Sequence, residues 1–187
     1  QGSGGLETRE DGYVKLKDLL ACKHKRISGH LKSATPDLIR HIVKICPKQR
    51  FRMEIFDKIE YIRANQGHSV KGVISSEKLL TKIKTPPKIC VHGTNLSAWL
   101  KIKTSGFLSK MTRNHIHFAK GLPGEDGVIS GMRSSCDVLI YMDAKKCLDS
   151  DIPFFESANG VLLSPGNEKG QIPLEMVEKV VVKGLKL

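Results

Sequence analysis

Two short stretches of the chain carry histidines whose types and spacing could bind a ligand. The segment His92–Thr94 follows an expected buried strand, Ile89–Val91, and places an imidazole, a bare backbone and a hydroxyl at its end, where open sheets tend to bind ligands. His115 and His117 flank a single residue, so both imidazoles share one face if that segment is extended. We therefore expect the two stretches to form one pocket.

Three kinds of chemistry are open to these imidazoles. They could hold a metal, but nothing nearby supplies a fitting fourth ligand, and His-x-His alone is a weak zinc signal. They could also be ordinary structural histidines. The interpretation we favour is a pocket that hydrogen-bonds a ligand and holds no metal.

Two arginines suggest what kind of substrate meets this pocket. Arg50 lies in Lys48–Phe51, and Arg133 lies in the glycine-punctuated segment Gly127–Ser135. The guanidinium group is a rigid, always-charged fork that suits bidentate phosphate contacts, although a surface arginine is the usual alternative. Neither histidine motif contains Asp or Glu. A site of Arg and His without carboxylates suits a substrate that is itself an anionic nucleophile.

Charge is distributed unevenly over the 187 residues, whose formal net charge is +12. Residues 1–85 carry 18 Lys and Arg against 9 Asp and Glu, whereas residues 86–187 carry 13 against 10. A basic first half beside a nearly neutral second half indicates that the first half meets a polyanion. The alternative is a lysine-rich surface that serves solubility.

The cysteines and the hydropathy pattern indicate in which cellular compartment the protein works. The five cysteines are scattered and never form a Cys-x-x-Cys pair, which favours a reducing, intracellular setting, cytoplasm or nucleus, without a disulfide framework. No apolar run is long enough to span a membrane, and no signal-peptide pattern opens the chain. The chain begins at Gln1 rather than Met, so we expect its N-terminus to be trimmed.

The pattern of elements predicts a mixed α+β protein of two lobes. Thr35 and Pro36 are a good helix start, and alternation in 51–55 and 59–62 predicts a two-stranded hairpin. Helices followed by a hairpin in a basic segment resemble a small winged-helix domain. The pair Pro86 and Pro87 can continue neither helix nor sheet, so we place the domain boundary between residues 85 and 86. Short strands and few helices follow.

Six short motifs occur in order along the chain, and any single one would be weak. The motifs are Lys48–Phe51, Arg63–Ser69, His92–Thr94, Arg113–His117, Gly127–Ser135 and Ser157–Val161. Taken together and in this order, over roughly Asp11 to Gly184, the sequence resembles one family, the tRNA 2′-phosphotransferases of the yeast and bacterial type.

The resemblance implies an N-terminal winged-helix RNA lobe, residues 1–85, and a C-terminal ADP-ribosyltransferase-like lobe that binds NAD, residues 86–187. It implies transfer of the splice-junction 2′-phosphate of tRNA to NAD, leaving a 2′-hydroxyl, nicotinamide and ADP-ribose 1″,2″-cyclic phosphate. Arg50 and Arg133 are then catalytic arginines that grip the 2′-phosphate. The NAD pocket would comprise His92, Gly93, Thr94, Arg113, His115 and His117.

One departure from the family concerns the N-terminus. The family carries a Leu-rich helix that ends in an essential Arg-His pair, upstream of the segment that leads to Asp11, and this chain begins after it. We therefore expect the native protein to be an enzyme, a monomer acting on 2′-phosphorylated RNA, whereas this chain alone could be inactive.

Two other hypotheses remain open. One is an ADP-ribosyltransferase that leaves ADP-ribose on a nucleic-acid phosphate or a protein. The other is a non-catalytic RNA-binding module with structural histidines, which predicts RNA binding that salt weakens steeply and no release of nicotinamide.

Overall fold

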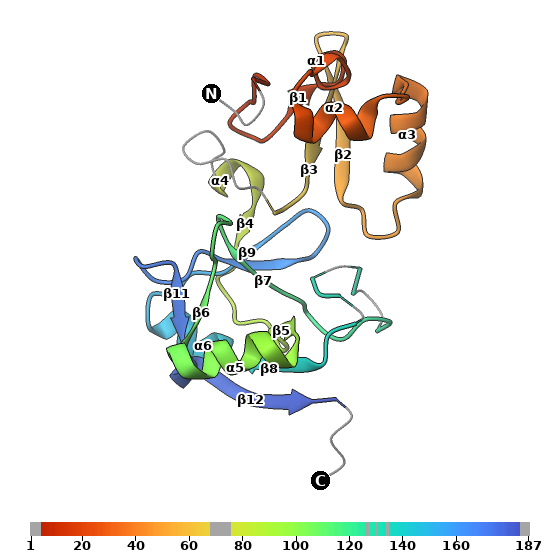
Figure 1. Ribbon diagram of the computed structural model, residues 1–187. Coiled ribbons are helices and arrows are strands. Elements are labelled where there is room, and N and C mark those ends of the chain that lie inside the picture. The colour runs from red at the N-terminus through yellow and green to blue at the C-terminus, as the bar shows by residue number, and fades with distance from the viewer. Residues whose placement is uncertain (1–4, 68–75, 126–127, 130, 134, 184–187) are drawn as a thin grey trace. The chain divides into compact units, whose positions relative to one another are not determined.

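The structure is a computed structural model that describes residues 5–67, 76–125, 128–129, 131–133 and 135–183 (Figure 1). The chain divides into two compact units, Gln1–Leu79 and Leu80–Leu187. Residues 80–85 belong with the second unit because β4 (Thr81–Lys82) pairs with β9 (Phe155–Glu156). Helices and antiparallel strands occur in both units, which confirms the α+β class.

The first unit is a three-stranded sheet in the order β1-β3-β2 with helices packed against it. All of its strand pairs are antiparallel. Its elements are β1 (Val14–Lys15), α1 (Leu16–Ala21), α2 (Lys25–Leu31), α3 (Pro36–Ile45), β2 (Phe51–Phe56), β3 (Ile59–Ala64) and α4 (Ser76–Leu79).

Local sequence explains the best-defined parts of this unit. Thr35 caps α3, since its hydroxyl accepts a hydrogen bond from the Leu38 N–H at 3.2 Å, and Pro36 takes the first helical position. Asp57 and Lys58 adopt positive φ angles of 49° and 64°, as a tight two-residue hairpin turn requires. The predicted helix start and hairpin are therefore confirmed.

Two sequence expectations for this unit were wrong. The helical spacing of Leu16, Leu19 and Leu20 predicts one helix over residues 13–20, but Val14 and Lys15 pair with β3 before α1 begins. The many basic residues of 22–33 predict a connection without regular structure, but these residues contain α2. Its Leu31 packs against the small core of Leu16, Ile39 and Ile62, so tertiary packing stabilises a helix with a weak apolar pattern.

The second unit consists of antiparallel strands with two short helices and one 3₁₀ helix in the described ranges. Its remaining elements are β5 (Val91–Thr94), α5 (Leu96–Ser105), β6 (Phe107–Ser109), β7 (Ile116–Phe118), β8 (Val138–Met142), α6 (Ala144–Asp149), β10 (Leu162–Ser164), β11 (Gln171–Pro173), η1 (Leu174–Met176) and β12 (Val177–Val182).

The strands of this unit form sheets in the orders β4-β9-β10-β7, β12-β8-β5 and β11-β6. A bridge between Val91 and Ala119 joins β5 to the chain just after β7, with N–H to carbonyl distances of 3.0 and 2.8 Å. The main core lies among these strands, where Phe118, Ile140 and Phe154 are fully buried. The bridge therefore holds the two histidine-bearing strands side by side over a common core.

Helix α5 begins and ends as its sequence predicts. Asn95 caps it by accepting a hydrogen bond from the Ala98 N–H at 2.8 Å, and Gly106 ends it in the left-handed region with φ 82°. None of the described helices is long and apolar enough to cross a membrane.

The bounds of β5 correct one sequence expectation. The strand was expected at Ile89–Val91 with His92–Thr94 as a turn at its end. In the structure His92, Gly93 and Thr94 are themselves strand residues, paired with Ile140, Leu139 and Val138 of β8. The pairing with β8 decides this, because it satisfies their backbone groups in a ladder.

Candidate functional site

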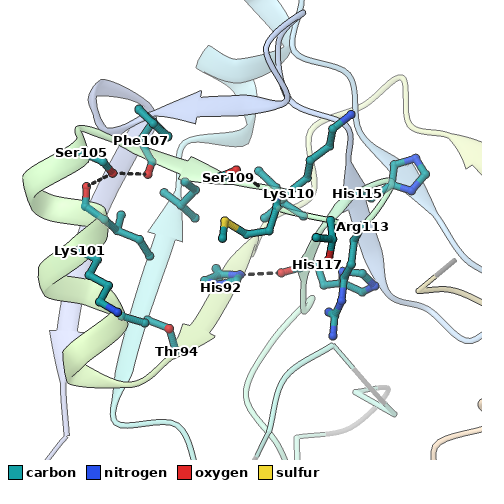
Figure 2. Close-up of a pocket in the computed structure, with 16 residues that line it drawn as sticks. His92, Thr94, Lys101, Ser105, Phe107, Ser109, Lys110, Arg113, His115 and His117 are labelled. Atoms are coloured by element: carbon teal, nitrogen blue, oxygen red, sulfur yellow. Dashed lines mark hydrogen bonds between the residues drawn. The ribbon is translucent and has the colours of Figure 1, made fainter. Parts of the chain in front are cut away.

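The second unit contains a cavity of about 550 Å³ that both histidine stretches line. Figure 2 shows its side chains, which come from β5, α5, β6, β7 and the segment between β6 and β7. The lining residues are His92, Thr94, Ala98, Lys101, Ile102, Ser105, Phe107, Leu108, Ser109, Lys110, Met111, Thr112, Arg113, His115, Ile116 and His117.

His92 presents a hydrogen-bond acceptor to this cavity. Its Nδ1 lies 2.8 Å from the His117 carbonyl oxygen (Figure 2), and a carbonyl can only accept, so Nδ1 carries the proton. Burial lowers the pKa of His92, which keeps the ring neutral near pH 7. Nε2 of a neutral ring protonated at Nδ1 bears a lone pair, so it can accept a hydrogen bond from a ligand hydroxyl.

His117 is the second buried imidazole of the cavity. Burial first, and then the charge of Arg113, lower its pKa to about 4. Its Nε2 is buried and has no hydrogen-bond partner among the described residues. A buried polar atom without a partner is uncommon in folded proteins, and a ligand in the cavity could supply the missing partner.

The charged residues of the cavity are all cationic. Lys101, Lys110 and Arg113 line it, and none of the lining residues is Asp or Glu. In Figure 2 Lys101 lies beside Thr94 on the α5 side, whereas Arg113 lies near His115 and His117. The cavity therefore combines apolar walls with positive charge from two sides, which suits a ligand with apolar rings and anionic groups.

A rigid turn carries Lys110 and Arg113. The Lys110 N–H donates to the Gly170 carbonyl at 3.1 Å, and the Arg113 N–H donates to the Lys110 carbonyl at 3.0 Å. Met111 between them has φ 54°, an unusual value for a side-chain-bearing residue. Backbone strain of this kind persists only where surrounding contacts enforce it, and it clusters at functional sites.

Gly93 does not line the cavity but permits close packing behind it. A Cβ at this position would lie 2.9 Å from Met132 Cβ and 2.9 Å from Cys136 Sγ. The Asp137 N–H also donates to the Thr94 carbonyl at 3.0 Å. Through these contacts the segment that carries Arg133 packs directly against strand β5.

Arg133 is exposed and lies outside the cavity lining. Two residues before it, Gly131 has φ 125°, and a Cβ there would lie 2.7 Å from Ala119 Cβ and 2.9 Å from the Phe118 carbonyl oxygen. The chain next to Arg133 thus packs against both β5 and the end of β7. Residues 126, 127, 130 and 134 of this motif lie outside the described residues.

Arg50 belongs to the first unit, where it precedes β2 and is exposed. The Asn65 N–H donates to its carbonyl at 2.9 Å, and the Asn65 side-chain amide donates to the Gln49 carbonyl at 2.6 Å. Gln49 has φ 44°. Asn65 of the motif Arg63–Ser69 therefore fixes the backbone that presents Arg50, whereas His68 and Ser69 lie outside the described residues.

The structure thus brings together five of the residues singled out from the sequence in one cavity: His92, Thr94, Arg113, His115 and His117. Gly93 supports them from behind, while Arg133 and Arg50 are held on fixed backbone elsewhere. Sequence reasoning missed the contribution of α5 and the following turn. The spacing of Ala98, Lys101, Ile102 and Ser105 on one helical face was a signal that could have found it.

Comparison with known proteins identifies similar chains. The family model described as RNA 2′-phosphotransferase, Tpt1 / KptA family, matches residues 2–166. A protein of Schizosaccharomyces pombe is 43% identical over 164 residues, which are 88% of this chain and 43% of that protein. The tRNA 2′-phosphotransferase of Saccharomyces cerevisiae is 42% identical over 96% of this chain and 76% of its own length.

A human protein, tRNA 2′-phosphotransferase 1, is 42% identical over 89% of this chain and 64% of its own length. The chain therefore spans less than two thirds of the S. pombe and human relatives, and about three quarters of the S. cerevisiae relative.

Proposed function

Because the chain belongs to the RNA 2′-phosphotransferase, Tpt1 / KptA family, we propose that it is an NAD-dependent tRNA 2′-phosphotransferase. The reaction moves the internal splice-junction 2′-phosphate of tRNA to NAD. Its products are RNA with a free 2′-hydroxyl, nicotinamide and ADP-ribose 1″,2″-cyclic phosphate. Such a reaction serves the last step of tRNA splicing, in the cytoplasm or nucleus, and the protein acts as a monomer.

In this proposal the first unit is a winged-helix RNA lobe, and the second is an ADP-ribosyltransferase-like lobe that binds NAD. Support for the first comes from helices α1–α3 packed on one face of a sheet that ends in the β2–β3 hairpin. The cavity in the second unit supports its assignment as the lobe that binds NAD. The lobes correspond to the units Gln1–Leu79 and Leu80–Leu187, whose boundary lies six residues before the expected one.

The observation that carries the proposal is the cavity's combination of a neutral His92 acceptor, three cations and no carboxylate. Ribose hydroxyls of NAD are donors that His92 Nε2 and Thr94 could bind. The pyrophosphate of NAD is dianionic, which Lys101, Lys110 and Arg113 would attract. The unpartnered His117 Nε2 leaves a further polar contact for the ligand.

The reaction needs positioning and charge stabilisation more than proton transfer. The RNA 2′-phosphate is the nucleophile of the first step, and NAD supplies the ribose carbon that it attacks and the 2″-hydroxyl used in the second. Because the nucleophile is already ionised, no carboxylate base is needed to activate it. Nicotinamide leaves in the first step. In the second step the 2″-oxygen bonds to phosphorus and loses its proton, and the RNA 2′-oxygen leaves phosphorus and gains one.

Arg50 and Arg133 are the residues we assign to the transferring phosphate. Each guanidinium can bind two phosphate oxygens at once, and negative charge on those oxygens grows as the second step forms a five-coordinate phosphorus. Preorganised cations stabilise that charge, and removal of one preorganised donor that contacts developing negative charge costs about 100- to 1,000-fold in kcat.

The direct test incubates full-length protein with a 2′-phosphorylated RNA and excess NAD, and follows nicotinamide and the cyclic phosphate of ADP-ribose. Release of both with loss of the 2′-phosphate is expected. If the 2′-phosphate stays on the RNA, the proposal fails. ADP-ribose that accumulates stably on the RNA or on protein would instead favour a plain ADP-ribosyltransferase.

Two substitutions in the second unit separate the phosphate contact from the NAD cavity. Arg133→Ala should abolish or stall turnover with unchanged folding, because the residue is exposed and supports no packing. His92→Ala should weaken NAD binding, measured by calorimetry, more than RNA binding. The reverse pattern would show that the cavity is not the NAD site.

A further inference from the structure

The sheet of the first unit has two faces of different composition. Val14, Met53 and Ile62 pack with the helices on one face. Successive side chains alternate across a strand, so Arg52, Phe56, Tyr61 and Arg63 are directed to the opposite face, which the helices α1–α3 do not cover. That face is rich in arginine and aromatic residues.

Three arginines lie at one end of this face, at the start of β2 and the end of β3. Arg52 and Arg63 lie directly opposite each other in the β2–β3 ladder. The hydrogen bond from Asn65 N–H to the Arg50 carbonyl continues the ladder in the same register, so the Arg50 backbone lies next to this face, at the end where its side chain also meets the Cys46 thiol. Two residues along a strand advance by about 7 Å, a step comparable to that between neighbouring phosphates of an extended nucleic-acid strand.

Aromatic rings continue the face beyond the arginines. The guanidinium of Arg9 lies over the rings of Phe56 and Tyr61, with Cζ at 4.4 and 5.6 Å from their centroids. The Arg9 side chain is 45% exposed, so its other side is open to solvent. Unpaired RNA bases stack on aromatic rings and on guanidinium planes alike, and Arg9 offers such a plane backed by two rings.

Charge on this face is positive even after its ion pairs are counted. Arg9 pairs with Asp11, Lys15 with Glu7 and Arg52 with Glu54, all partly exposed. Exposed ion pairs contribute little energy, so a phosphate can compete for these cations. Arg63 is held in place on this face, since its Nη1 donates to the Asp11 carbonyl at 2.9 Å and its Cζ lies 4.7 Å from the centroid of the Tyr13 ring. Among the described residues, no ion pair includes Arg50 or Arg63.

From these contacts we propose that this face binds the single-stranded RNA that flanks the transferred 2′-phosphate. We call it the arginine–aromatic face, composed of Arg9, Arg50, Arg52, Phe56, Tyr61 and Arg63. The proposal rests on the proposed function, in which Arg50 contacts the 2′-phosphate. Arg52 then contacts the neighbouring backbone phosphate, and a base stacks on Arg9.

The test compares Arg52→Ala with a matched control, Arg40→Ala. Arg40 is also an exposed arginine paired with a carboxylate, Glu60, but it lies on α3, on the helix-covered side of the sheet. A labelled RNA 12-mer with an internal 2′-phosphate serves as the ligand, and its affinity is measured by fluorescence anisotropy at several salt concentrations without NAD.

Arg52→Ala should weaken binding several-fold and lower the slope of log Kd against log salt by about 0.7, the loss of one single-strand phosphate contact. Arg40→Ala should leave both values unchanged. Arg9→Lys keeps the charge but removes the guanidinium plane, so it should weaken binding with the slope unchanged. An equal effect of Arg40→Ala and Arg52→Ala, or no effect of Arg52→Ala, overturns the proposal.

Turnover separates this proposal from the proposed function. With the 12-mer and excess NAD, Arg40→Ala should release nicotinamide as the unchanged protein does, whereas Arg52→Ala should raise the KM for the 12-mer several-fold. If the 12-mer binds as expected but no nicotinamide is ever released, the phosphotransferase proposal fails and the RNA face stands. If nicotinamide is released and Arg52→Ala binds the 12-mer normally, the RNA face fails alone.

Discussion

Replacing Gly131 with alanine should destabilise the second unit and disturb the segment that carries Arg133. A residue with a side chain at φ 125° adopts backbone that only glycine visits readily, at a cost of order 1–3 kcal/mol. The new Cβ would also approach Ala119 Cβ to 2.7 Å and the Ala119 Cα to 2.8 Å, and overpacking of this kind costs about 1–3 kcal/mol more. We expect a total loss of about 2–6 kcal/mol.

Gly124→Ala is the matched control within the same loop. Gly124 has φ 96°, but a Cβ there meets no heavy atom within 4 Å, so only the backbone cost of about 1–3 kcal/mol applies. The difference between the two variants therefore measures the contact with Ala119.

Urea unfolding measures both variants. Trp99 is the only tryptophan of the chain and belongs to the second unit, so its fluorescence reports the unfolding of that unit. Equal losses of unfolding free energy in the two variants would refute the packing argument. Below the unfolding transition, Gly131→Ala should also lower turnover more than Gly124→Ala, because the displaced segment carries Arg133.

Three further predictions follow. The His117 pKa of about 4 in the folded protein lies below the unfolded value of 6.5, so the unfolded chain binds the proton first as the pH falls. The free energy of unfolding measured in urea should therefore fall by about 3 kcal/mol between pH 6.5 and 4. His117→Phe should remove most of this pH dependence. Thr35→Ala should cost about 1 kcal/mol in unfolding of the first unit, followed by circular dichroism. Lys101→Ala should weaken NAD binding severalfold in calorimetry at low salt, and less at high salt.

Local signals allowed much of the fold to be predicted. The caps Thr35, Asn95 and Gly106 act within a few residues of themselves, and each marks a helix end where the sequence placed it. Strand β1 and helix α2 were missed for the opposite reason. Val14 becomes a strand residue only by pairing with Ile62, a partner far along the chain that no local pattern reveals.

The candidate site likewise contains residues that the sequence revealed and residues that only the structure revealed. The histidine stretches were recognisable by residue type, and five of the residues singled out line one cavity. Helix α5 supplies Lys101 to that cavity on a face that it shares with Ala98, Ile102 and Ser105. The apolar residues of the helix by themselves did not indicate that this mixed face lines a cavity. The role of each residue toward NAD and RNA stays a prediction.

By itself the sequence determined the residue types of the site, the basic character of the first half and the ordered motifs that place the chain in its family. The tertiary structure decided that His92 is a strand residue, because β8 pairs with it. It also decided the proton position of His92, because the His117 carbonyl faces Nδ1. Both depend on groups that are distant in sequence and adjacent only after β5 and β7 are joined through Val91 and Ala119.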